Sequence, residues 1–81
     1  MSEVSKMIEE IVELCYQQKK VEAYNKLNLF IGELAKVMVG FSEDKVKKVN
    51  EILQDILAAM EEDDIVAIAD LMEYELKEKI A

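Results

Sequence analysis

Apolar side chains recur at intervals of three and four residues in four separate stretches of this 81-residue chain. This spacing gathers apolar side chains on one face of an α-helix and leaves the opposite face to charged residues. The stretches are residues 3–17, 20–39 and 43–61, and a fourth from an Asp63 or Asp64 cap to Lys79. There is no proline, and only two glycines are present to interrupt a helix.

Helices of similar length with short connections favour antiparallel neighbours. We therefore predict an all-α fold, an antiparallel up-down four-helix bundle in which residues 1–81 form a single domain. Each stretch is expected to contribute its apolar face to one core. The positions expected to be buried include Ile11, Phe30, Ile56 and Met72, and also Ala35 and Leu57.

Three connections are predicted between the helices. The centre of the apolar face moves by roughly 140° between the first two stretches at 100° per residue, which predicts a turn at residues 17–20. Gly40 is expected to end the second helix in the left-handed conformation, and Ser42 to cap the third. The acidic run Glu61–Asp64 makes the last turn, where helix capping and solubility account for most of its charge.

The negative charge of the chain disfavours binding to nucleic acid and to membranes. The net charge is −8, and residues 61–81 carry eight acids against two lysines. Such a surface repels nucleic acid and anionic lipid, because phosphate contacts need clustered lysine and arginine. We expect neither a nucleic-acid partner nor a membrane partner. No uncharged run approaches the length of a membrane span, and Cys15 has no second cysteine to pair with, so we expect a cytoplasmic protein.

The chain contains no histidine, which removes the commonest base and zinc ligand. Carboxylates remain. Glu10 with Glu13, and Asp70 with Glu73, have the i, i+3 spacing of magnesium-binding acids in all-α nucleotide pyrophosphohydrolases. A solvated helix face explains these acids better, since metal catalysis needs ligands that converge in one cavity. A magnesium-dependent hydrolase is kept as an alternative, and we predict no catalytic residue, no metal site and no cofactor.

A second apolar stripe on the fourth helix is the strongest functional signal in the sequence. Ala67, Leu71 and Tyr74 follow one another at i, i+4 and i+7, beside the expected core stripe. Acidic residues border them, namely Asp70, Glu75 and Glu78. Such a stripe either widens the buried arc of the helix, with Leu71 beside Ile68, or binds a partner helix, and tyrosine is a frequent anchor at interfaces. We predict a non-enzymatic interaction module that binds a protein partner or a second copy of itself here, with a small export-chaperone-like protein as another alternative.

The run Asp64-Ile-Val-Ala-Ile-Ala-Asp-Leu-Met-Glu-Tyr-Glu-Leu76 resembles the C-terminal signature of a group of short bacterial all-helical proteins of unknown activity. Its Asp-Leu-x-Glu-Tyr-Glu-Leu core is the part that matches, and Ile68 and Met72 replace two leucines of that signature. The resemblance implies an independent bacterial domain and points at Asp70, Glu73, Tyr74 and Glu75. It implies no mechanism.

Overall fold

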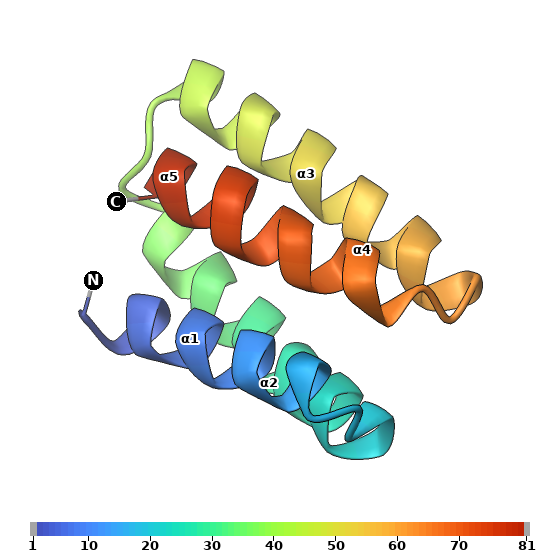
Figure 1. Ribbon diagram of the computed structural model, residues 1–81. Coiled ribbons are helices and arrows are strands. Elements are labelled where there is room, and N and C mark those ends of the chain that lie inside the picture. Colours follow the sequence, from blue (N-terminus) through green and yellow to red (C-terminus); the bar gives the residue numbers. More distant parts are fainter. Residues whose placement is uncertain (1, 81) are drawn as a thin grey trace.

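The computed structural model describes residues 2–80, and these residues form four helices with no strand among them (Figure 1). The first three are α1 (Ser2–Tyr16), α2 (Lys20–Met38) and α3 (Glu43–Glu61). The fourth helix comprises three consecutive segments, α4 (Ile65–Asp70), η1 (Leu71–Leu76) and α5 (Lys77–Ile80). The expected all-α fold is therefore confirmed, and every helix boundary lies within one or two residues of its predicted position.

The fourth helix lies between α1 and α3 (Figure 1); it contacts α3 along its whole length and α1 mainly through α4 and η1. The other side of α1 packs against α2, and α2 lies behind α1 in Figure 1. The molecule measures 34 × 23 × 19 Å along its principal axes. Residues far apart in the sequence, at the start and the end of the chain, thus lie side by side along α1 and the fourth helix.

Nineteen apolar residues, drawn from all four helices, form a single buried cluster that contains no polar side chain of the described residues. It includes Ile11, Phe30, Ile56 and Met72, as expected. Two expectations were wrong. Ala35 is exposed and Leu57 is 48% exposed, because each lies about 100° around its helix from the buried Leu34 or Ile56.

The end of α2 differs from the predicted conformation at Gly40. Gly40 does not adopt a positive φ, so the predicted left-handed end of α2 was wrong. The left-handed residues are instead Gln18, with φ of 60°, and Asp63, with φ of 54°. The amide of the next residue bonds back to Leu14 in the first turn and to Ala59 in the second, so both turns are Schellman motifs.

The predicted caps of the last two helices are confirmed. Ser42 Oγ accepts a hydrogen bond from the Lys45 amide at 3.2 Å. Asp64 Oδ1 accepts one from the Ala67 amide at 3.1 Å. These bonds satisfy amide groups that the first turn of a helix leaves unpaired.

The middle of the fourth helix is wound as a π-helix over η1. Its end is marked by the Lys77 amide, which bonds to the carbonyl of Met72, five residues earlier. A turn closed in this way holds more residues than an α-turn, so it changes which side chains share a face. Within residues 2–80, no helix has the length and apolarity needed to cross a bilayer.

Candidate functional site

A cavity of about 140 Å³ opens at the seam between α1 and the fourth helix. Buried Ile8 and Val12 line it on the apolar side. Its polar lining consists of Glu9, Glu13 and Tyr16 of α1 and Glu73 and Lys77 of the fourth helix. The α1 residues recur at i, i+4 and i+7, and the other two at i and i+4, so one edge of each helix faces the same space.

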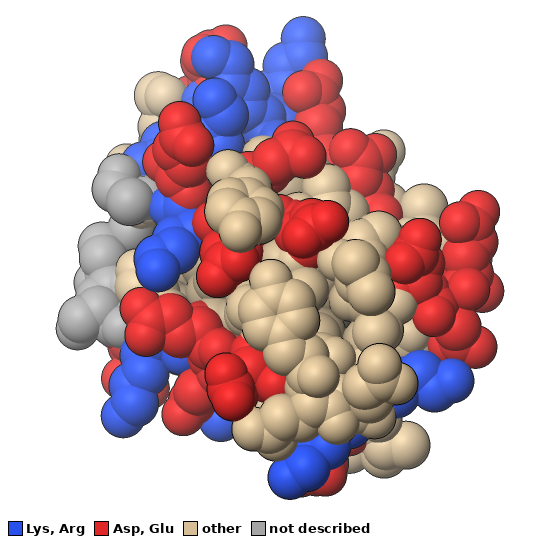
Figure 2. All heavy atoms as spheres, in the orientation of Figure 1, with Lys and Arg blue, Asp and Glu red and all other residues tan. Residues whose placement is uncertain are grey.

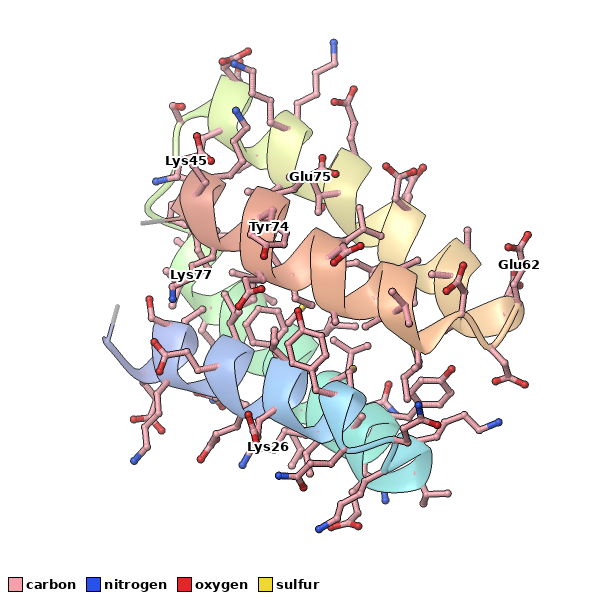
Figure 3. The ribbon with its side chains drawn as sticks, in the orientation of Figure 1. Lys26, Lys45, Glu62, Tyr74, Glu75 and Lys77 are labelled. Atoms are coloured by element: carbon pink, nitrogen blue, oxygen red, sulfur yellow. The ribbon has the colours of Figure 1, made fainter. Side chains whose placement is uncertain are left out.

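Two polar contacts join the helices across this seam. Tyr16 Oη donates a hydrogen bond to Glu73 Oε1 at 3.2 Å. Lys77 Nζ lies 3.4 Å from Glu9 Oε2, and this exposed ion pair contributes little net free energy. Figure 3 shows Lys77 on the edge of the fourth helix toward α1 and Glu75 on the edge toward α3. The sequence separations of 57 and 68 residues make both contacts long-range.

The electrostatics of the seam are acidic. Partial burial and the neighbouring Glu73 carboxylate raise the pKa of Tyr16. The negative charge of Glu73 also raises the pKa of Tyr74, with a smaller effect from Asp70. Among the described residues no lysine lies within ion-pair distance of Glu13, Asp70 or Glu73. These three carboxylates therefore leave the seam with uncompensated negative charge.

The stripe predicted on the fourth helix is only partly exposed. Ala67 and Leu71 are half-buried and pack against the core, whereas Tyr74 is 64% exposed. The acids predicted to border the stripe, Asp70, Glu75 and Glu78, are all exposed. The structure thus splits the predicted surface: Tyr74 is presented to solvent, and the other two apolar members serve the core as well.

On this side of the molecule, sequence reasoning missed two exposed apolar residues, Tyr16 and Val66. Val66 precedes Asp70 by four residues and Glu73 by seven, which places it on the α1 side of the fourth helix. Figure 2 shows uncharged side chains across the centre of this side of the molecule, with acidic side chains around them. We name this surface the seam face. It consists of Tyr16, Val66 and Tyr74 together with Glu13, Asp70 and Glu73.

The four carboxylates of the alternative hydrolase are not brought to one place. Glu10 pairs with Lys26 of α2 at 3.0 Å, while Glu73 accepts its bond from Tyr16. Of these four carboxylates, only those of Glu13 and Glu73 line the seam cavity. Over residues 2–80, no group of three aspartate, glutamate or cysteine side chains is placed to hold a metal ion.

Two residues of the acidic run at residues 61–64, Asp63 and Asp64, make contacts within the fold. Asp63 Oδ1 accepts a hydrogen bond from Tyr24 at 3.2 Å, and its other oxygen lies 3.4 Å from Lys20 Nζ. Asp64 caps the fourth helix. Asp63 therefore joins the start of α2 to the connection after α3, and with the Asp64 cap half of this run has a structural role.

Comparisons with curated proteins and with solved structures give no match. A family model does match, under the description "Domain of unknown function (DUF8042)", and it covers residues 1–81. Because the match extends over the whole chain, this protein belongs to the DUF8042 family.

Proposed function

We propose that this chain is a non-enzymatic interaction module whose seam face binds an amphipathic helix of a partner protein. The observation that supports it is the seam face itself, where the exposed apolar groups of Tyr16, Val66 and Tyr74 adjoin three carboxylates without a lysine partner. Partner helices bury apolar anchors in such surfaces, and tyrosine is enriched among interface anchors. Because these carboxylates are negative, the complementary partner helix carries lysine or arginine beside its apolar side chains.

The seam offers an entry for one such basic side chain. The cavity presents Glu13 and Glu73 over an apolar lining of Ile8 and Val12. A lysine or arginine places its aliphatic stem on apolar surface while its charged end reaches the carboxylates. The Lys77–Glu9 pair at the far end of the cavity is exposed and weak, so a partner cation displaces it at small cost.

The arrangement proposed for this module is an antiparallel up-down bundle. Connections of three or four residues between successive helices, and a fourth helix beside both α1 and α3, support it. We also propose a cytoplasmic and bacterial setting. Support for the first comes from the buried, unpaired thiol of Cys15, and for the second from the resemblance of residues 64–76 to a bacterial signature.

Binding to synthetic helical peptides tests the proposal. One peptide carries leucine at i, i+3, i+4 and i+7 with lysine beside them, and a second carries glutamate in place of lysine. The chain should bind the basic peptide alone, with an affinity that falls as salt rises. The double substitution Val66→Ser, Tyr74→Ser should weaken binding at least tenfold, because it removes about 1.4 kcal/mol or more of anchor burial.

The matched control is Leu57→Ser, which also removes an exposed apolar side chain, but from α3. It should leave the affinity unchanged. Equal binding of both peptides, or equal loss in the control and in the double variant, would show that the seam face is not the binding surface.

A further inference from the structure

The outward side of α2 carries an uncharged strip along the whole helix. Val21 and Val39 stand at its ends, 71% and 87% exposed, and Leu29 beside its centre is 66% exposed. Between the two valines lie four further exposed residues at alternating spacings of four and three, namely Asn25, Asn28, Gly32 and Ala35. Exposed helix faces are normally charged, and 35% of this chain is charged, so the strip is unusual for a solvated surface.

Gly32 lies at the centre of the strip and has no role inside the fold. A glycine in the interior of a helix costs about 1 kcal/mol relative to alanine. A Cβ added at Gly32 would meet no atom within 4 Å, so packing within the chain does not require its absence. What a glycine permits here is the close approach of another backbone from outside.

The charges of the helices favour a second copy of this chain as the occupant. The molecule carries a net charge of −8, so two copies repel each other over most of their surfaces. Acids outnumber lysines in α1, in α3 and in the fourth helix, whereas α2 has three lysines against two glutamates. Association through α2 therefore meets the least repulsion.

The order of residues in the strip is self-complementary. A two-fold axis beside residue 30 sets Val21 opposite Val39, Asn25 opposite Ala35 and Asn28 opposite Gly32 when two α2 helices run antiparallel. Large side chains then meet at both ends, and each asparagine faces a small residue. The strip spans 18 residue steps, about 27 Å of helix.

The flank of the strip adds complementary charge. Glu22 and Lys36 lie on the same side of it, and the two-fold rotation brings Glu22 of one copy near Lys36 of the partner subunit. In a parallel pairing these groups would face the opposite flank, where the one lysine, Lys20, already lies 3.4 Å from Asp63 of its own subunit. Lys36 also lies 3.2 Å from Glu33 of its own helix, an exposed i, i+3 pair that leaves it free to contact a second carboxylate.

From these observations we propose that two copies form a homodimer by antiparallel pairing of α2 through this strip. The seam face between α1 and the fourth helix is a separate surface, so the dimer does not depend on the function proposed for that face. Its formation leaves both seam faces available for partners.

Analytical ultracentrifugation of the full chain tests the dimer. The wild type should sediment at twice its 9.3 kDa mass at micromolar concentration. Gly32→Lys should sediment at 9.3 kDa with unchanged helicity, since the new side chain meets open space within its own subunit. Ala58→Lys, at an exposed position of α3, is the control and should remain dimeric. A monomeric wild type, or a dimeric Gly32→Lys, overturns the proposal.

Charge reversal tests the antiparallel register independently. Glu22→Lys and Lys36→Glu should each weaken dimerisation about tenfold, because each places two like-charged pairs across the interface. The double variant restores both pairs with reversed sign and should recover most of the affinity. Glu51→Lys on α3 is the control for the change in net charge and should have no effect. Failure of the double variant to recover overturns the proposed register.

Discussion

Glu73 is the residue on which the seam depends most. Its carboxylate accepts the Tyr16 hydrogen bond, lines the cavity and sits close enough to Tyr74 to raise the pKa of that phenol. The signature-like run at residues 64–76 pointed at this residue, but the contact with Tyr16, 57 residues away, follows only from how α1 and the fourth helix pack. The Glu73 side chain thus both accepts the hydrogen bond across the seam and supplies part of the negative charge there.

The substitution Glu73→Gln should lower the pKa of both Tyr16 and Tyr74, because it removes the negative charge that opposes phenol ionisation. Absorbance at 295 nm during alkaline titration, or the NMR shift of the phenolic carbon, measures this. Tyr24 is the internal control, since its pKa is raised by burial and by Asp63 instead. If Tyr16 and Tyr74 titrate as in the wild type, Glu73 does not set the potential of the seam.

The raised pKa values of Tyr16 and Tyr74 also determine how the free energy of unfolding changes at alkaline pH. Phenols with a raised pKa in the folded state stay protonated when the unfolded chain, with its ordinary pKa of 10, already ionises. Their contribution is fully present below pH 10 and is lost as the pH rises through the folded-state pKa. Glu73→Gln should therefore make the fall in stability above pH 10 less steep.

At the scale of the helices, apolar periodicity predicted existence and boundaries well, because each helix has one buried face and short polar connections. Apolar periodicity did not predict the local backbone conformation at the helix ends or within the fourth helix. Gly40 was expected to be left-handed, yet Gln18 and Asp63 adopt that conformation, because the Schellman motifs after α1 and α3 place them at the left-handed position. The π-wound η1 segment was not predicted, although the buried residues through it, Ile68, Met72, Leu76 and Ile80, recur at unbroken steps of four.

The left-handed turn after α1 yields a stability prediction. A residue with a Cβ loses about 1–2 kcal/mol in this conformation, and glycine does not. Gln18→Gly should therefore raise the free energy of unfolding by about 1 kcal/mol, after allowance for the greater freedom of glycine in the unfolded chain. Urea denaturation followed by circular dichroism measures it.

Gln17→Gly is the matched control, because Gln17 does not have a positive φ. It should lower the free energy of unfolding. If both variants are destabilised to the same extent, the turn does not hold Gln18 in the left-handed region.

At the scale of the whole molecule, the sequence predicted a partner surface on the fourth helix, and only part of the predicted stripe is exposed. Tyr74 and Asp70 are exposed as predicted, whereas Ala67 and Leu71 are partly used by the core. Tyr16 and Val66 were missed because the seam face joins two helices from opposite ends of the chain. Helical spacing identifies faces on one helix, and the pairing of helices decides which of those faces form one surface.

The most direct test of the proposed function is an NMR titration of the isotope-labelled chain with the basic amphipathic peptide. Amide shifts should change along the seam, at Glu13, Tyr16, Val66, Asp70, Glu73 and Tyr74, and should saturate with the peptide. The acidic peptide should produce no shifts. Shifts confined to α2 or α3, or no saturable response to the basic peptide, would contradict the claim that the seam face receives a partner helix.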